Sequence, residues 1–370
     1  MTISCIAVTS NSDLPETHLF IGLWLVGIDL EVMCPPNAPH RQLLIKAGIT
    51  VTDLVLTSRI DRGGISMIKA RLLAHKPAIL HAFNNRAVSN SLFASKGLNI
   101  SFIAYRGIEG NVSYYDPMSW TTYLHPRVDA IVCVANAIRD YFLNMRLLGI
   151  KRPVKKALTI YKGHRREWYE HPGVDLKQWG ISEGAFVVAC TVNDRPRKGL
   201  DQLIAATALL PNKVPNKDIH IVLIGQISNV TLLQQIKDSA FRENIHLLGF
   251  QTNAHAIVKN CDVCILPAVK REGLPKGIIE GMIQGVAPIV TNSGGSPELI
   301  EDNVSGQIIP PRSPEAIADA ILAYYNNREW LQSVKENAIK RIVNCFPTEK
   351  TIEQHLDLYR RLIAKRQIKS

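Results

Sequence analysis

The sequence contains no long hydrophobic run and no N-terminal targeting pattern. No apolar stretch of the 370 residues approaches the ~20 residues that a transmembrane helix needs, so no membrane span is expected. The first residues, 2–8, lack the basic segment that opens a signal peptide and instead resemble a first β-strand. The sequence therefore predicts neither a membrane span nor a signal peptide.

Several motifs that define other protein classes are also missing. No G-x-G-x-x-G follows a predicted strand, which argues against a dinucleotide-dependent dehydrogenase. No D-x-D motif marks a metal site, and no zinc-finger spacing, ribonucleoprotein-type aromatic motif or basic heptad helix indicates nucleic-acid binding. We therefore expect no metal, no cofactor and no nucleic-acid partner.

The seven cysteines are scattered, mostly within apolar segments. Cys261 and Cys264 have C-x-x-C spacing, but no second pair or nearby histidine completes a zinc site. We expect buried, reduced thiols that behave as small hydrophobic side chains. Reduced thiols predict a cytoplasmic protein.

The composition is that of a soluble globular protein, with 46% hydrophobic and 20% charged residues. A chain of this length fits two domains better than one. The net charge of +11 is uneven, with +8 in residues 1–170 and +3 in residues 171–370. A basic N-terminal half suits an anionic membrane face or an anionic acceptor, although solubility alone also explains it.

Short β-branched segments alternate with amphipathic segments along the whole chain, which predicts two α/β domains with parallel sheets. The predicted strands are 3–9, 30–34, 51–56, 78–82, 100–105, 129–134, 157–161, 185–192, 219–224, 245–248, 263–267, 287–291 and 306–309. The predicted helices are 16–27, 64–75, 86–95, 135–148, 199–209, 229–240, 253–260, 276–284, 296–301 and 314–324. After residue 313 the chain is expected to be almost wholly helical, with one break at Pro347.

The most informative segment is R-E-G-L-P-K-G-I-I-E-G-M-I-Q-G, residues 271–285, which follows an apolar strand. Pro275 stands where a helix begins, and proline suits the first helical position. The free amides of that first turn attract an anion. Glu272 and Glu280 flank the turn with seven residues between them, so a nucleotide sugar would find amides for its diphosphate and acceptors for its hydroxyls.

This segment resembles the E-x7-E motif of the retaining GT-B glycosyltransferases of family 4. The following A-P-I-V-T-N-S-G-G-S-P-E-L-I, residues 287–300, is similar to that family's strand, double-glycine loop and Pro-Glu helix start. The resemblance is strongest over residues 185–344. It implies two Rossmann-like domains facing across a cleft: an acceptor domain, 1–165, on which the final helix, 348–370, packs back, and a donor domain, 175–345. The polar segment 161–179 would be the hinge.

The resemblance also implies a function. The protein would move a hexosyl unit from a nucleotide-diphosphate sugar to a cell-surface glycan or glycolipid, as in lipopolysaccharide or polysaccharide biosynthesis, with retention and without a metal. Peripheral contact with the inner membrane would fit such an acceptor. A nucleotide-sugar epimerase or sugar phosphorylase of the same fold remains an alternative, as does a non-catalytic sugar- or anion-binding subunit.

The resemblance assigns roles on the donor side. Lys198 matches the family's diphosphate lysine, Glu272 would bind the donor sugar and Glu280 the ribose. The usual arginine five or six residues before the lysine is absent, so Arg195 or Arg197 would supply the second phosphate contact. The remaining donor-site candidates are Gly273, Leu274, Lys276, Gly277 and Phe250, the last beside the nucleobase.

On the acceptor side the resemblance points to three side chains. His18 lies at the first strand-to-helix turn, where the family's paired glycines are missing, and His81 closes another strand. Arg106 stands where many relatives have a histidine near the transferring sugar. Arginine cannot act as a base at neutral pH, so Arg106 would stabilise the departing phosphate or bind an anionic acceptor.

Overall fold

The computed structural model describes residues 2–210 and 218–368. The chain forms two compact units. Unit 1 takes its residues from 1–163 and 346–370, and unit 2 comprises residues 164–345. In the described part of the chain, no helix is long and apolar enough to cross a membrane.

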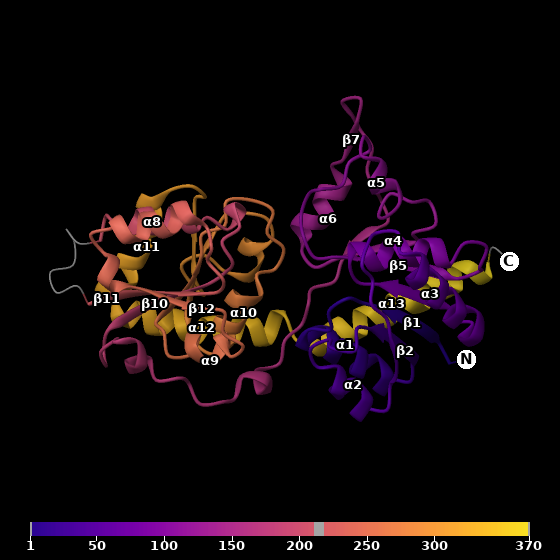
Figure 1. The fold of residues 1–370 in the computed structure, drawn as a ribbon, viewed down its shortest axis with the longest axis horizontal. Coiled ribbons are helices and arrows are strands. Elements are labelled where there is room, and N and C mark those ends of the chain that lie inside the picture. The colour runs from indigo at the N-terminus through magenta and orange to yellow at the C-terminus, as the bar shows by residue number, and fades with distance from the viewer. Residues whose placement is uncertain (1, 211–217, 369–370) are drawn as a thin grey trace. The chain divides into compact units, whose positions relative to one another are not determined.

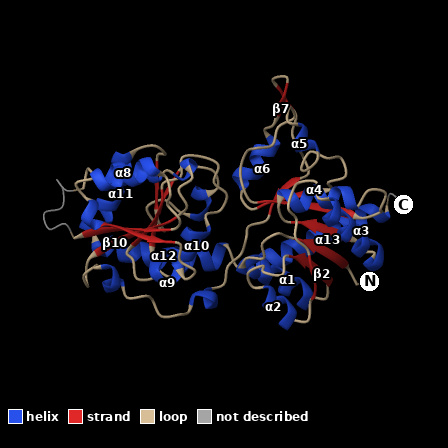
Figure 2. Ribbon diagram, in the orientation of Figure 1, coloured by secondary structure: helices blue, strands red, loops and turns tan. Residues whose placement is uncertain are grey.

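Unit 1 is built on a seven-stranded parallel sheet with the order β3-β2-β1-β4-β5-β6-β9 (Figures 1 and 2). Its central strands are continuous apolar runs because helices cover both faces of such a sheet. The strands are β1 (Ser4–Val8), β2 (Asp29–Cys34), β3 (Thr50–Asp53), β4 (Ile79–Ala82), β5 (Ser101–Arg106), β6 (Ala130–Cys133) and β9 (Ala157–Thr159). The helices are α1 (Leu14–Leu25), α2 (Arg41–Lys46), α3 (Arg62–His75), α4 (Asn85–Ala94), α5 (Pro117–Trp120), α6 (Asn136–Leu143) and α13 (Thr348–Gln367).

The last helix, α13, completes the core of unit 1. It packs on α1 so closely that a Cβ on Gly22 would lie 2.1 Å from Cδ1 of Ile352. Further along α13, His355 and Tyr359 are buried, and the Tyr359 hydroxyl is 2.9 Å from Nδ1 of His81. The two ends of the chain therefore belong to the same unit.

Unit 2 contains a six-stranded parallel sheet with the order β12-β11-β10-β13-β14-β15. Its strands are β10 (Phe186–Thr191), β11 (Ile219–Ile224), β12 (Ile245–Gly249), β13 (Val263–Leu266), β14 (Ala287–Thr291) and β15 (Gln307–Ile309). Its α-helices are α7 (Leu200–Thr207), α8 (Val230–Asp238), α9 (Ala254–Val258), α10 (Lys276–Ile283), α11 (Pro314–Asn326) and α12 (Arg328–Cys345). Short 3₁₀ helices lie at η1 (Arg166–Tyr169), η2 (Leu176–Trp179), η3 (Pro196–Lys198), η4 (Arg242–Asn244) and η5 (Ser296–Leu299).

The predicted α/β class with two parallel sheets is confirmed, and so is the burial of most cysteines. Six of the seven thiols are buried, Cys345 is half-buried, and all seven are free.

Three secondary-structure predictions were wrong. The helix predicted over 135–148 ends at Leu143, and the chain turns back as a hairpin of β7 (Arg146–Leu147) and β8 (Ile150–Lys151). The segment after β8 binds a carbonyl that a longer helix would have used, because the amide of Val154 donates to the carbonyl of Phe142 at 3.0 Å.

The other two errors lie near the end of unit 2. The helix predicted over 296–301 is only the 3₁₀ turn η5. The helical segment after residue 313 is broken at Asn327 as well as before Thr348. Asn327 starts α12 by accepting the amide of Trp330 with its side chain at 2.9 Å, which is the geometry of an N-cap.

Candidate functional site

The candidate site in unit 2 lies where the strand order reverses. The chain runs outward from β10 to β11 and β12 on one side, and β13 is the other neighbour of β10. In open α/β sheets, the crevice at the carboxyl ends of two such strands is where ligands bind. The loops that follow β10 and β13 carry Lys198 and Glu272, so the fold brings these two predicted site residues to the same edge of the sheet.

These two loops are fastened to each other. The amide of Val269 donates to the carbonyl of Arg197 at 2.9 Å. Gly199 has a φ of +69°, and a Cβ there would lie 1.9 Å from the carbonyl oxygen of Pro267. Only glycine satisfies both conditions, so the conformation of the loop after β10 depends on that residue.

The loop after β14 holds Glu272 from the other side. Gly294 has a φ of +57°, and a Cβ there would lie 2.1 Å from the carbonyl oxygen of Glu272. The amide of Gly295 donates to that same oxygen at 3.2 Å. The double-glycine loop thus fixes the backbone of Glu272, the residue that the sequence analysis predicts to bind the donor sugar.

Lys198 and Glu272 form an ion pair. Nζ of Lys198 lies 3.0 Å from both carboxylate oxygens of Glu272, and Nη1 of Arg197 lies 3.6 Å from Oε2. The side chains of Lys198 and Glu272 are only 16% and 8% exposed. A carboxylate withdrawn from water to this degree needs such partners. The site therefore presents two cations around one nearly buried acid.

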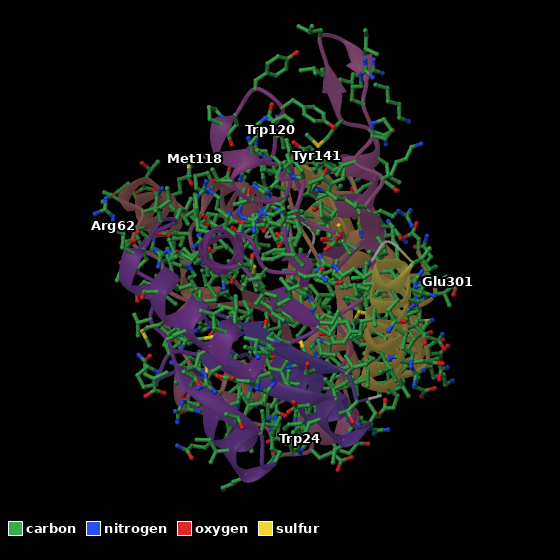
Figure 3. The ribbon with its side chains drawn as sticks, turned by 90° about the vertical axis from the view of Figure 1, so that its right-hand side faces the viewer. Trp24, Arg62, Met118, Trp120, Tyr141 and Glu301 are labelled. Carbon is green, nitrogen blue, oxygen red and sulfur yellow. The ribbon has the colours of Figure 1, made fainter. Side chains whose placement is uncertain are left out.

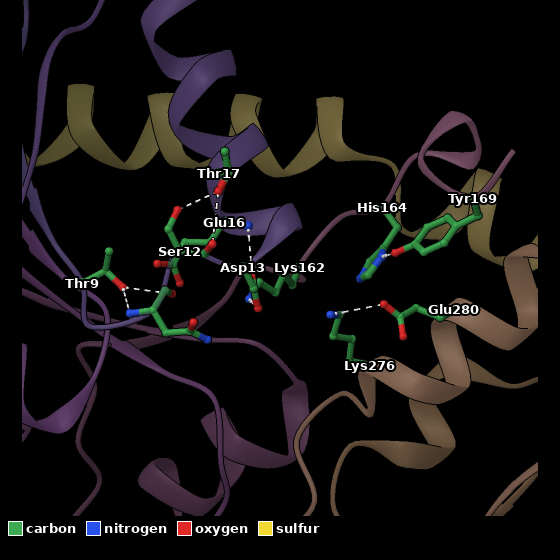
Figure 4. A network of polar contacts seen from close by, with 11 residues as sticks. Thr9, Ser12, Asp13, Glu16, Thr17, Lys162, His164, Tyr169, Lys276 and Glu280 are labelled. Carbon is green, nitrogen blue, oxygen red and sulfur yellow. Dashed lines mark hydrogen bonds and ion pairs between the residues drawn. The ribbon is translucent and has the colours of Figure 1, made fainter. Parts of the chain in front are cut away.

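Helix α10 begins beside this pair. Lys276 is the first helical residue, as the predicted range 276–284 has it, and Pro275 is the N-cap and does not occupy the first helical position. Nζ of Lys276 lies 3.3 Å from Oε1 of Glu280, in an i,i+4 pair whose lysine is 54% exposed (Figure 4). The amides of Lys276 and Gly277 are in the first turn, where helix amides have no intrahelical acceptor.

The other donor-side candidates lie around the same loops. Gly273 is buried and Leu274 half-buried between Glu272 and α10. Arg195 is exposed and lines a cavity of about 280 Å³ with Asp194, Leu200 and Gln235. Phe250 follows β12 and is 73% exposed, so its ring is accessible.

The acceptor-side candidates have different surroundings within unit 1. His81 is fully buried on β4 against Tyr359, and burial lowers its pKa well below the usual value, so the ring is neutral. Arg106, at the end of β5, is 3% exposed. It donates to Oδ1 of Asn85 at 3.1 Å and to the carbonyl of Gly110, and its guanidinium lies 4.9 Å from the centre of the Tyr123 ring. His18 is half-buried on α1.

The sequence analysis missed Glu16. This residue lies on the first turn of α1, after β1, at the point where β1 and β4 mark the strand reversal of unit 1 (Figure 4). Glu16 is 6% exposed, and its Oε1 receives no hydrogen bond from the described residues. Burial raises its pKa to about 8, although the charge of Lys162 opposes the shift. The carboxyl group is therefore protonated at neutral pH.

Lys162 and Asp13 complete this polar cluster. Nζ of Lys162 lies 2.5 Å from Oδ2 of Asp13, and the other oxygen of Asp13 caps α1 by accepting the amide of Glu16 at 3.0 Å. Glu16 follows three residues after a capping aspartate, so its sequence position is typical of an ordinary first-turn acid. Only the tertiary packing shows that it is buried.

Residues 2–210 and 218–368 contain no group of three or more histidine, cysteine or acidic side chains that could hold a metal ion.

Comparisons with known proteins show what the chain is similar to. Residues 174–341 match the model of glycosyl transferases group 1. An uncharacterised glycosyltransferase of Methanocaldococcus jannaschii is 23% identical over 69% of this chain and 64% of its own, so the chain spans less than two thirds of that relative. The Escherichia coli UDP-Gal:alpha-D-GlcNAc-diphosphoundecaprenol alpha-1,3-galactosyltransferase is 26% identical over 83% of this chain and 75% of its own.

A solved structure supports the fold over nearly the whole length. The crystal structure of Anabaena HepE in complex with UDP-glucose superposes with a TM-score of 0.76 at 17% identity, covering 96% of this chain and 99% of that one. The predicted GT-B architecture is confirmed. The chain has the GT-B fold, and its residues 174–341 are similar to the glycosyl transferases group 1.

Proposed function

We propose that this protein is a retaining glycosyltransferase that moves a hexosyl unit from a nucleotide-diphosphate sugar to a glycan or glycolipid acceptor. The observation that carries the proposal is the pair formed by Lys198 and Glu272 at the strand reversal of unit 2. A basic group and an acid are held together there beside the start of α10, and a diphosphate sugar offers a partner for each of these three features.

The donor would be held by complementary chemistry. An ammonium has three donors, so Lys198 can keep Glu272 as a partner and still bind a phosphate oxygen. Arg197 and the amides of Lys276 and Gly277 would share the remaining negative charge, while Glu272 accepts hydrogen bonds from the sugar and Glu280 from the ribose. Charge that develops on a leaving group is stabilised most by donors already in place.

The reaction needs no separate protein base. The acceptor oxygen would form its bond to the anomeric carbon on the face that the nucleoside diphosphate leaves, and a phosphate oxygen would take the proton from the acceptor hydroxyl. Because Lys198 and Arg197 supply positive charge, we propose that transfer requires no divalent metal.

The relatives suggest the partners. The E. coli relative is named for a UDP-Gal donor and a diphosphoundecaprenol-linked acceptor, and HepE was solved with UDP-glucose. We propose a uridine diphosphate hexose as donor and a lipid-linked saccharide of cell-surface polysaccharide or lipopolysaccharide synthesis as acceptor, used on the cytoplasmic side. Unit 1 would hold the acceptor near Glu16, whereas Arg106 would serve to hold the loop after β5.

The test is a transfer assay with UDP-glucose, UDP-galactose and their N-acetyl forms and a lipid-linked acceptor. UDP release and an NMR spectrum of the product should show transfer with the anomeric configuration kept, with and without a chelator. Glu272→Ala should lower turnover at least hundredfold while circular dichroism stays unchanged.

Three results would contradict the proposal: inversion, loss of activity in chelator, or wild-type turnover in the alanine variant. Conversion of the donor sugar without acceptor would identify an epimerase instead. Tight UDP-sugar binding without even slow hydrolysis would identify a binding subunit.

A further inference from the structure

The β7–β8 hairpin of unit 1 extends away from the sheet of that unit (Figure 1). Arg146 pairs with Lys151 and Leu147 with Ile150, and Leu148 and Gly149 form the turn. Both turn residues have positive φ, 51° and 77°. The two strands are thus joined by a two-residue turn of the type that requires left-handed backbone at both turn residues.

Leucine is an unusual residue at this turn. Asparagine, aspartate and glycine adopt the left-handed conformation most readily, and a bulky apolar side chain adopts it at a cost. Leu148 is nevertheless there, and its side chain is 79% exposed. Leucine raises the energy of the left-handed backbone at this position, and its exposed side chain is poorly solvated by water. Its presence there indicates that the side chain contacts an apolar partner.

Other apolar and aromatic side chains surround the hairpin. Ile150 is 60% exposed, Tyr115 is 64% exposed and Trp120 is 44% exposed. The Tyr115 hydroxyl accepts the amide of Leu148 at 2.6 Å, and Nε1 of Trp120 donates to the carbonyl of Tyr114 at 3.0 Å. The first bond fastens the hairpin to the segment before α5, and the second holds Trp120 to that same segment. Trp120 lies at the end of unit 1 that carries the hairpin (Figure 3). Tyrosine and tryptophan are the residues enriched at membrane–water interfaces.

The same region is strongly basic. Residues 141–163 include six lysines and arginines and no acidic residue. Arg146, Lys151 and Arg152 are exposed within and beside the hairpin. A second copy of the chain docked on this surface would oppose these like charges, whereas an anionic lipid surface would attract them.

We propose that the apolar tip formed by Leu148 and Ile150 inserts into the headgroup region of an anionic bilayer, with Tyr115 and Trp120 at the interface and Arg146, Lys151 and Arg152 on lipid phosphates. This surface provides peripheral attachment and does not depend on any catalytic step. Its area is small, so attachment is reversible and depends on both apolar and ionic contributions.

The experiment is co-sedimentation of the full chain with vesicles of phosphatidylglycerol and phosphatidylcholine, and with vesicles of phosphatidylcholine alone. The test variant is Leu148→Asn, because asparagine suits the left-handed turn and should preserve or improve folding. The matched control is Val230→Asn in unit 2, where the original side chain is equally exposed at 80%.

We expect the wild type to bind anionic vesicles, to bind neutral vesicles weakly, and to dissociate in high salt. Leu148→Asn should bind about tenfold more weakly, the change expected from losing one inserted leucine, with unchanged circular dichroism, while Val230→Asn binds like the wild type. Equal binding by wild type and Leu148→Asn would overturn the proposal. So would a dimer in lipid-free sedimentation velocity that Leu148→Asn abolishes, because the surface would then be a self-interface.

Discussion

Two lysine–glutamate pairs lie within a few residues of each other in unit 2, and their surroundings differ. The Lys198–Glu272 pair is mostly shielded from water, whereas Lys276 of the second pair is half exposed. Exposed pairs contribute little to stability because solvent screens them. The two pairs therefore compare a lysine–glutamate contact in which both side chains are shielded with one in which the lysine is exposed.

We expect double-mutant cycles to separate them. Urea unfolding of Lys198→Met, Glu272→Gln and the double variant should give a coupling energy of about 1–2 kcal/mol, as for contacting shielded groups. The matched cycle of Lys276→Met and Glu280→Gln should give about 0.3 kcal/mol. Equal couplings would show that the shielding of Glu272 has no energetic consequence.

Glu16 should make the stability of unit 1 depend on pH. Its pKa is about 8 in the folded protein, so between pH 4.5 and 8 the folded state binds a proton that the unfolded state lacks. The contribution of this group to the free energy of unfolding is fully present below pH 4.5. It is lost as the pH rises from 4.5 to about 8, and the total loss is several kcal/mol.

Glu16→Gln should flatten that dependence, because the amide resembles the protonated acid in shape and cannot ionise. Unfolding by urea from pH 5 to 9 measures it, with the exposed Glu353→Gln on α13 as control. If Glu16→Gln and the wild type lose stability in parallel over this range, Glu16 is ionised in the folded protein.

At the scale of elements, the donor-side geometry is set by loops that fasten one another. The loop after β14 approaches the loop after β13 at Gly294 without room for a Cβ, and the loop after β10 approaches at Gly199 in the same way. Side chains on these loops are consequently in place before a ligand arrives, which lowers the cost of binding.

Gly294→Ala should displace the backbone of Glu272, although the two residues are far apart in the sequence. The new methyl group would collide with the Glu272 carbonyl, so we expect a loss of about 3 kcal/mol in stability and of most transferase activity. Gly180→Ala is the control, since its φ is also positive, at 74°, but nothing lies within 4 Å of the added atom. That variant should lose about 1 kcal/mol. Equal losses would indicate that backbone conformation alone matters, without the collision.

The sequence predicted the elements whose signal is local. Strands such as β10 and β13 are apolar runs, and the glutamates around α10 belong to a spaced pattern, so the sequence alone predicts both. The β7–β8 hairpin was missed because residues 141–148 continue the apolar spacing of a helix, and only the returning strand stops it. Glu16 was missed because its burial comes from residues distant in sequence.

At the scale of the whole molecule, unit 1 needs both ends of the chain. Removal of residues 346–370 would uncover the face of α1 around Gly22 and the ring of His81. We expect fast hydrogen exchange throughout β1, β4 and β5 in that truncated protein, while β10, β11 and β13 keep their protection. A chain ended at Ile368 should behave like the wild type. Protection of β1 without α13 would show that the helix is dispensable.

This arrangement of the chain has a consequence for synthesis. A ribosome completes every residue of unit 2 before it makes α13. Unit 2 can therefore reach its native state before unit 1. Until α13 has been made, the face of α1 around Gly22, on which Ile352 packs, stays uncovered. Newly made molecules should therefore depend on chaperones chiefly through their earliest-made half.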